Sequence, residues 1–215
     1  MYIGIIGRLK KDKINYYRFN AEVANVITSY GFKPLGIIVD FNNDCYKEFK
    51  LLKPLLDMCS GFILQGGSEY YDIDILITNY LHSRNCPTLG ICLGMQLMAM
   101  TFGGKMGTTK NHNQNFKYVH FTNIFKGSKL YNIIKKDNIL VNSRHNDYIV
   151  STNLLVSSRA NVIESIEDYT KDFFIGVQWH PESLMDENSK LLFDALFNTI
   201  KCQKKGLFLK KDLPK

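Results

Sequence analysis

The first half of the chain alternates between short apolar runs and stretches with helical periodicity. Apolar runs of strand length occur at residues 2–7, 32–40 and 61–67. Apolar positions recur at helical spacing in residues 20–30, 46–58 and 72–82. Strands that alternate with helices in this way predict a parallel sheet covered by helices on both faces.

The ends of these elements have sequence signals of their own. Gly31 follows the helix predicted at residues 20–30 and suits its C′ position. Pro54 lies within the helix predicted at residues 46–58, where we expect a break or a new first turn. Residues 86–104 predict a strand, a sharp turn and an apolar helix that ends at Gly103 and Gly104.

The second half of the chain has a different pattern, rich in strands. Strands are expected within residues 118–124, 138–143, 153–159, 161–168 and 173–182, and a helix at residues 189–201. These strands are expected to extend the sheet or to add a smaller antiparallel one beside it. No repeat or linker divides the chain, so we expect one domain at residues 1–200 and a basic C-terminal tail at residues 201–215.

Composition narrows the class of protein. The chain has 215 residues, 45% of them apolar, and no uninterrupted apolar run long enough to span a membrane, so we expect a cytoplasmic protein. Its five cysteines include no CxxC pair, which argues against a zinc site and a disulfide framework. We therefore expect neither a metal nor a cofactor. The net charge of +7 comes from lysines spread along the chain, so no nucleic-acid partner is expected.

A candidate nucleophile lies where a predicted strand meets a predicted helix. The segment Gly90-Ile91-Cys92-Leu93-Gly94 has the form of a nucleophile elbow with sulfur in place of oxygen. Glycines on both sides allow a tight turn in which any Cβ would collide. A thiol at a helix N-terminus faces the positive end of the macrodipole, which favours the thiolate. Alone, the pentapeptide fits a small buried cysteine equally well.

A candidate base follows at the end of the last predicted strand, in Gly176-Val177-Gln178-Trp179-His180-Pro181-Glu182. Pro181 favours extended backbone angles at His180, and we expect His180 and Glu182 to project to the same side of an extended chain. The carboxylate could then accept the imidazole N–H and direct the other ring nitrogen toward a thiol. An elbow and a later His-Pro-Glu in this order predict a Cys92, His180 and Glu182 catalytic triad.

The chain resembles class I glutamine amidotransferases, whose elbow G-x-C-x-G-x-Q and later H-P-E match Gly90–Gln96 and His180–Glu182. Within that superfamily it is more similar to the γ-glutamyl hydrolase branch, peptidase family C26, which includes γ-glutamyl-γ-aminobutyrate hydrolases. The segments that carry this similarity are Leu64-Gln65-Gly66-Gly67, the elbow, Val141-Asn142-Ser143-Arg144-His145 and GVQWHPE. In that branch a second histidine and a glutamine often follow, whereas Asn146 and Asp147 stand here.

The resemblance implies a three-layer αβα fold around a mainly parallel sheet, similar to that of flavodoxin. It implies an oxyanion hole formed by the backbone N–H groups of Leu93 and of Gly67 or Gly66. Gln96 lies one helical turn after Cys92 and is a candidate for binding the glutamyl group. Further candidates rest on the resemblance: Gln65, Ser143, Arg144 and His145. His112 and His120 have no such support and are expected to be structural or exposed.

The activity predicted from these residues is hydrolysis of a γ-glutamyl amide through a thioester on Cys92. The leaving amine stays open between a polyamine derivative, an amino acid, a phosphoramidate and ammonia. One alternative is a glutaminase subunit that delivers ammonia to a separate synthetase partner. Another is a binding module for γ-glutamyl compounds that has lost catalysis, which the presence of all three triad residue types disfavours. Oligomeric state cannot be read from the sequence.

Overall fold

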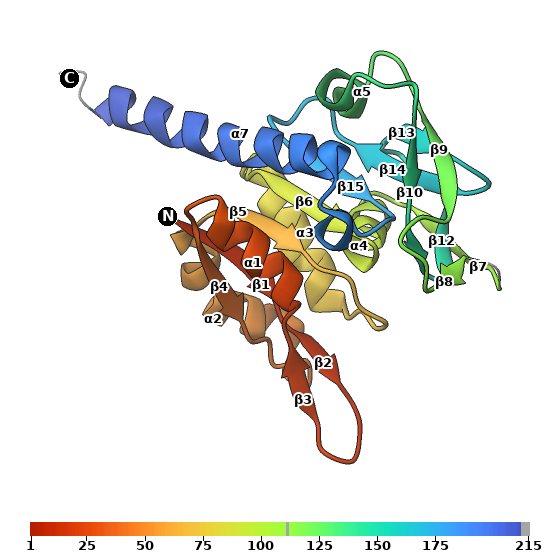
Figure 1. The fold of residues 1–215 in the computed structure, drawn as a ribbon. Coiled ribbons are helices and arrows are strands. Elements are labelled where there is room, and N and C mark those ends of the chain that lie inside the picture. The colour runs from red at the N-terminus through yellow and green to blue at the C-terminus, as the bar shows by residue number, and fades with distance from the viewer. Residues whose placement is uncertain (111, 212–215) are drawn as a thin grey trace.

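A computed structural model describes residues 1–110 and 112–211, with side chains described as far as residue 206. Its centre is a nine-stranded sheet in the order β10-β9-β13-β14-β15-β6-β5-β1-β4 (Figure 1). Strands β4, β1, β5, β6 and β15 are parallel to one another, and the pairs from β15 to β10 are antiparallel. The predicted α/β class is confirmed, with a parallel half and an antiparallel half.

The parallel half forms from the apolar runs of the sequence. Its strands are β1 (Tyr2–Ile6), β4 (Lys33–Ile37), β5 (Cys59–Leu64), β6 (Thr88–Ile91) and β15 (Phe174–Val177). Strands β6 and β15 are buried along their whole length, as expected of central strands with helices on both faces. Because the five strands are parallel, their carboxyl ends meet at one edge of the sheet, where ligands bind in open α/β folds.

The antiparallel half contains β9 (His120–Ile124), β10 (Asn138–Val141), β13 (Leu155–Arg159) and β14 (Ile163–Glu167). Every segment of the second half in which a strand was expected contains one. Four further strands form two short ladders beside the sheet: β7 (Lys105–Thr108) with β12 (Asp147–Ser151), and β8 (Asn113–Gln114) with β11 (Ser143–Arg144). The sequence pattern did not predict these ladders.

Helices cover both faces of the sheet and complete three layers. On one face, α1 (Ala21–Ser29), α5 (Lys129–Ile134) and α7 (Glu187–Lys211) bury apolar side chains against the sheet. On the other, α2 (Cys45–Met58), α3 (Asp72–Ser83) and α4 (Leu93–Thr101) do the same. The short α6 (Pro181–Leu184) follows β15. No helix within the described residues has the length and apolarity needed to cross a membrane.

Two helices differ from their predicted bounds. Helix α2 runs through Pro54 without a break. Pro54 and Lys50, whose carbonyl loses its intrahelical donor at this proline, are both exposed, so solvent can hydrogen-bond the carbonyl. Helix α7 begins at Glu187 and continues to Lys211, about three turns beyond the predicted end, and its last part projects from the body of the protein (Figure 1). The division into a domain and a tail stays a prediction.

A hairpin that the sequence pattern did not predict follows β1. Strands β2 (Arg8–Lys10) and β3 (Tyr16–Arg18) pair antiparallel and project from the carboxyl edge of the parallel strands (Figure 1). Its base is fixed by an ion pair between Arg8 and Asp74 at 2.6 Å, in which both side chains are buried. The hairpin therefore forms one wall beside the candidate site.

Candidate active site

Cys92 lies between β6 and α4 in a strained backbone conformation. Its φ of 53° and ψ of −106° fall in a region that non-glycine residues rarely adopt, and such outliers gather at active sites. Its N–H donates to the Val177 carbonyl at 2.8 Å, which holds the turn against β15. Cys92 is therefore the N-cap of α4, with its thiol at the positive end of the helix.

The glycines of the elbow are required by close backbone contacts. A Cβ on Gly94 would lie 2.0 Å from the Leu64 carbonyl oxygen of β5. A Cβ on Gly90 would lie 2.7 Å from the backbone of Gly94. Real side chains do not tolerate such distances, so only glycine lets α4 start this close to the sheet. The steric role predicted for both glycines agrees with these contacts.

His180 and Glu182 follow β15, with His180 as the N-cap of α6 and Glu182 within that helix, and His180 lies close to Cys92. The Nδ1 of His180 and Oε1 of Glu182 are 2.8 Å apart, and Glu182 is almost fully buried. Burial by itself lowers the pKa of His180, but hydrogen bonds to Cys92 and Glu182 and the charges of both groups outweigh it and raise the pKa to about 10. His180 is therefore an imidazolium at neutral pH, paired with a carboxylate on one side and sulfur on the other.

The local backbone at Glu182 differs from the prediction. His180 has the expected near-extended angles, φ −108° and ψ 84°, but Pro181 then begins the helical turn of α6, and Glu182 belongs to that turn. The expectation of an extended chain through Glu182 was wrong. Proline suits the first helical position because its fixed φ is helical and its missing N–H would have no partner there. The turn still directs Glu182 back toward the ring of His180.

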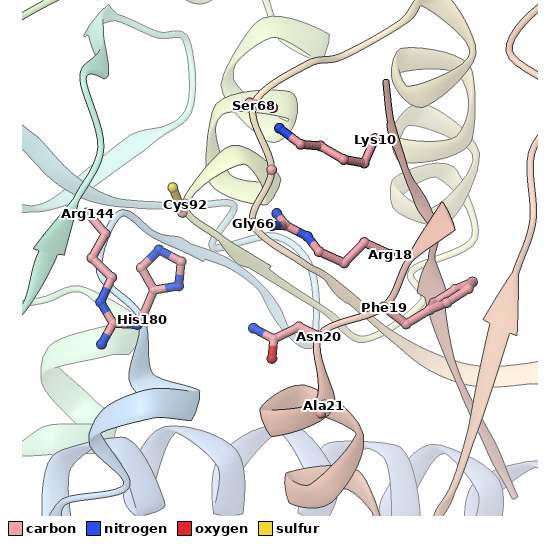
Figure 2. A pocket seen from close by; sticks show the side chains of 11 residues that line it. Lys10, Arg18, Phe19, Asn20, Ala21, Gly66, Ser68, Cys92, Arg144 and His180 are labelled. Carbon is pink, nitrogen blue, oxygen red and sulfur yellow. The ribbon is translucent and has the colours of Figure 1, made fainter. Parts of the chain in front are cut away.

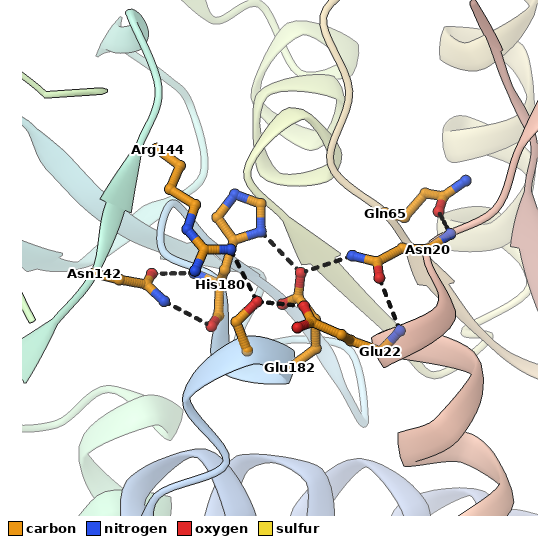
Figure 3. Close-up of polar contacts among 8 residues, drawn as sticks. Asn20, Glu22, Gln65, Asn142, Arg144, His180 and Glu182 are labelled. Carbon is orange, nitrogen blue, oxygen red and sulfur yellow. Dashed lines mark hydrogen bonds and ion pairs between the residues drawn. The ribbon is translucent and has the colours of Figure 1, made fainter. Parts of the chain in front are cut away.

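Two asparagines hold this pair in place (Figure 3). Asn142 accepts a hydrogen bond from the His180 N–H at 2.7 Å and donates to the His180 carbonyl at 3.1 Å. Asn20, the N-cap of α1, donates to Oε1 of Glu182 at 3.2 Å. The histidine backbone and the carboxylate are thus both fixed by neutral side chains, which add no competing charge.

The three residues predicted for the oxyanion hole lie close to Cys92. A Cβ on Gly66 would lie 3.0 Å from Cε1 of His180 and 3.6 Å from Cβ of Cys92, so the Gly66 backbone lies directly beside both. A Cβ on Gly67 would contact the Leu93 side chain at 2.9 Å. Leu93 is the first residue of α4, where backbone N–H groups have no intrahelical acceptor.

A cavity of about 630 Å³ opens over Cys92 (Figure 2). Its described lining residues are Lys10, Arg18, Phe19, Asn20, Ala21, Gly66, Gly67, Ser68, Cys92, Arg144 and His180. Besides the imidazolium of His180, they include the cationic side chains of Lys10, Arg18 and Arg144, and they include no carboxylate. In Figure 2, Lys10 and Arg18 extend from the hairpin toward the loop of Gly66, and Arg144 extends from the opposite wall. The electrostatic character of the cavity is therefore positive.

Of the residues predicted to bind the glutamyl group, Arg144 alone is among the described residues that line this cavity. Gln65 donates to the Ile6 and Arg18 carbonyls and accepts from the Asn20 N–H, so it fixes the base of the hairpin. Gln96 donates to the Asp147 carbonyl and to Gln178. Both glutamines are buried, and these hydrogen bonds commit their amides to the protein.

Ser143 and His145 are also buried away from the cavity. The Ser143 hydroxyl donates to the His112 carbonyl, and Nδ1 of His145 lies 2.9 Å from the Asp147 carbonyl. Both side chains hold the β8–β11 ladder and the turn that follows it. A substrate role for Gln65, Gln96, Ser143 or His145 would require these hydrogen bonds to break.

Sequence reasoning missed Lys10, Arg18, Asn20 and Asn142. Lys10 and Arg18 carry no motif, and only the folded hairpin brings them to the cavity. Asn20 begins a predicted helix, so a cap could be expected there, but the contact with Glu182 spans 162 positions. Asn142 lies in a segment that carries the family resemblance, and that segment was the one available signal for its role.

Comparisons of the sequence with a family profile and with known proteins agree on one family. The profile described as Glutamine amidotransferase class-I matches residues 15–199. The chain is 33% identical over 141 residues to a subunit of the glutamine-hydrolyzing GMP synthase of Picrophilus torridus, which covers 62% of this chain and 72% of that protein. It is 28% identical over 208 residues to the glutamine-hydrolyzing GMP synthase of Brachyspira hyodysenteriae, covering 90% of this chain but 37% of that longer protein.

The fold is likewise similar to a solved structure. A protein from Thermoplasma acidophilum described as a putative GMP synthase subunit superposes with a TM-score of 0.72 at 18% identity, covering 99% of this chain and 98% of that one. These findings support the class I amidotransferase part of the predicted resemblance and do not single out the peptidase C26 branch. The chain belongs to the glutamine amidotransferase class-I family.

Proposed function

We propose that this chain hydrolyses the γ-amide of glutamine through a thioester on Cys92 and delivers the ammonia to a separate synthetase. The observation that carries the proposal is the strained cysteine at a helix N-terminus, with a histidine close by that Glu182 holds and whose pKa is raised. A thiolate and an imidazolium are the nucleophile and the general acid that amide cleavage needs.

The reaction proceeds in two halves. The Cys92 thiolate attacks the γ-carbonyl carbon, and the bond to nitrogen breaks as the imidazolium of His180 gives its proton to the departing ammonia. A water molecule then loses a proton to the neutral imidazole and attacks the thioester, releasing glutamate and restoring the thiolate. Glu182 and Asn142 keep the ring and its backbone oriented through both halves.

The developing oxyanion is held by backbone N–H groups of Leu93 and of Gly66 or Gly67. The support for this assignment is the position of the glycines beside Cys92 and Leu93, and of Leu93 at the start of α4. Each such donor lowers the barrier by about 3 kcal/mol when it is aimed at the oxyanion.

Delivery of ammonia to a partner is supported by the relatives. The Picrophilus torridus protein is named as one subunit of a glutamine-hydrolyzing GMP synthase, and that name implies a second subunit. By analogy, a synthetase partner would activate this chain and receive the ammonia. The proposal includes a synthetase partner and names neither that synthetase nor the substrate that it aminates.

A second candidate is a free-standing hydrolase of γ-glutamyl amides whose leaving amine is anionic. The observation in its favour is the cavity, which is lined by Lys10, Arg18 and Arg144 and is of the size that binds drug-sized ligands. Ammonia needs no such cations, and a polyamine would be repelled by them. An amino acid or a phosphoramidate bears the negative charge that these side chains attract.

Glutamate release by the purified chain separates the candidates. The substrates are glutamine, a γ-glutamyl amino acid, a γ-glutamyl phosphoramidate and a γ-glutamyl polyamine. Slow turnover of glutamine alone, with no preference for the anionic amides, supports the glutaminase subunit. Rapid turnover of an anionic amide without a partner supports the hydrolase. Binding of these compounds without turnover by the unmodified chain would contradict the free-standing hydrolase and favour a binding module.

A further inference from the structure

The antiparallel half contains a second cluster of chemically active side chains, outside the candidate active site. One ligand atom each from His112, His120 and Glu164 lies within 4.8 Å of the other two. His112 precedes β8, His120 begins β9 and Glu164 lies in β14, so the cluster joins three separate elements. Glu164 is fully buried, and neither histidine is exposed.

The hydrogen bonds within the described residues leave this cluster incomplete. Nε2 of His120 lies 3.1 Å from Oε1 of Glu164. The other carboxylate oxygen of Glu164 and Nδ1 of His112 are buried without a partner. A buried polar atom without a partner costs about 1–3 kcal/mol, and more for a charged group, so two in one cluster call for an explanation.

We propose that His112, His120 and Glu164 bind one divalent transition-metal ion of the zinc type. Two imidazole nitrogens and one carboxylate oxygen form a donor set that such ions favour. The cation would use the two atoms that lack partners and would neutralise the charge of Glu164.

The geometry requires a small adjustment. Zinc–ligand bonds of about 2.0–2.1 Å in a tetrahedron place ligand atoms about 3.4 Å apart. The widest separation in the cluster is bounded by 4.8 Å, so the side chains must close by at most about 1.4 Å. His145 lies next to the cluster, with its ring centroid 5.2 Å from that of His112 and its Nε2 buried without a partner. Nε2 of His145 could therefore serve as a fourth ligand to the ion.

The bound ion would stabilise the wall of the active site. The His112 carbonyl accepts hydrogen bonds from the Ser143 hydroxyl and the His145 N–H, and β8 pairs with β11, which carries Arg144. Glu164 accepts the Gln178 N–H through its own carbonyl, two residues before His180. Fixing His112 to β9 and β14 would therefore fix the strand that places Arg144 at the cavity. The role is structural, and the proposal does not depend on the proposed function.

Zinc binding is best measured in a Cys92→Ala, Cys202→Ser background, because thiolates bind zinc as well. After treatment with a chelator, this protein is titrated with Zn²⁺ by calorimetry and its thermal unfolding is followed. We expect one Zn²⁺ per chain, a rise in melting temperature of at least about 5 °C at saturating metal, and no such rise with Mg²⁺ or Ca²⁺. Absence of stoichiometric zinc binding would overturn the proposal.

Substitution of the proposed ligands tests whether the ion binds at this cluster. His112→Ala and His120→Ala should each weaken Zn²⁺ binding at least tenfold. His82→Ala is the matched control, since His82 also pairs with a carboxylate, Asp168 at 2.7 Å, in a different part of the fold. Undiminished binding by both cluster variants, or an equal loss in the control, would contradict the assignment. If a variant does not fold, the Co²⁺ spectrum of the background protein decides: tetrahedral bands without thiolate charge transfer support the site, and their absence refutes it.

Discussion

The two halves of the central sheet differ in how they form the candidate site. In the parallel half, β6 and β15 end side by side, and the motifs at their ends bring Cys92 and His180 close together beside Gly66. Beside the antiparallel half, Arg144 reaches the cavity from a two-residue strand that pairs only with β8, outside the central sheet. The difference teaches that the reaction is specified by local motifs at strand ends, whereas the choice of substrate depends on long-range placement of the walls.

The largest effect on activity is expected from a change of Cys92, the proposed nucleophile at the end of the parallel strand β6. Cys92→Ala should lower glutamate release at least about 10⁴-fold, because the thioester can no longer form. Cys202→Ala, at an exposed cysteine of α7, should keep full activity. The assay measures glutamate from glutamine and from γ-glutamyl amides. Equal activity of the two variants on every substrate would exclude Cys92 as the nucleophile.

Loss of the Glu182 carboxylate should lower activity nearly as much as loss of the Cys92 thiol. Glu182→Gln keeps the size of the side chain but removes the charge that stabilises the imidazolium, and kcat should fall roughly 10³-fold with little change in KM. Circular dichroism should confirm that the fold is intact. A fall in kcat smaller than about threefold would mean that Glu182 does not orient His180.

The pH dependence of kcat/KM tests whether Glu182 stabilises the imidazolium of His180. Because the pKa of His180 is raised to about 10, the imidazolium persists through neutral pH and is lost as pH rises through that value. We expect kcat/KM to fall on the alkaline side near pH 10, with no loss near 6.5, where an ordinary histidine titrates. In Glu182→Gln the alkaline limb should move to lower pH, since one cause of the raised pKa is removed. A limb at the same pH in both proteins would assign it to another group.

The smallest effect on activity is expected from a change of Arg18 in the cavity wall. Arg18→Ala should raise KM about tenfold for γ-glutamyl amides with an anionic leaving group, through loss of a charge-assisted contact, and change KM for glutamine less than twofold. Lys13→Ala is the matched control, an exposed lysine of the same hairpin that is not among the cavity residues. Equal changes in KM for both substrates would remove the argument for an anionic leaving group.

The elements of the parallel half could be predicted from the sequence because their signals are local. Apolar runs of strand length, the helix stop at Gly31 and the glycines around Cys92 each reflect a constraint within a few residues. Pro54 shows the limit of such rules, since exposure of the affected carbonyl makes the proline tolerable within α2.

The walls of the site could not be predicted in the same way. The hairpin that carries Lys10 and Arg18 has weak strand character and is held by the buried pair of Arg8 and Asp74, 66 positions apart. Gln65 and Gln96 occur in the expected motifs but satisfy backbone groups of distant segments. Hydrogen bonds that span tens of residues leave no periodic signal in one sequence, so the partners of a polar side chain become known from the fold.

Trapping of the covalent intermediate tests the central claim most directly. The chain is mixed with a γ-glutamyl amide substrate, quenched in acid within the first turnovers and digested, and the peptides are analysed by mass spectrometry. The account predicts a mass increase of one glutamyl group on the peptide that contains Cys92, and no increase in Cys92→Ala. A substrate that turns over without this adduct, or with an adduct on another residue, would contradict it.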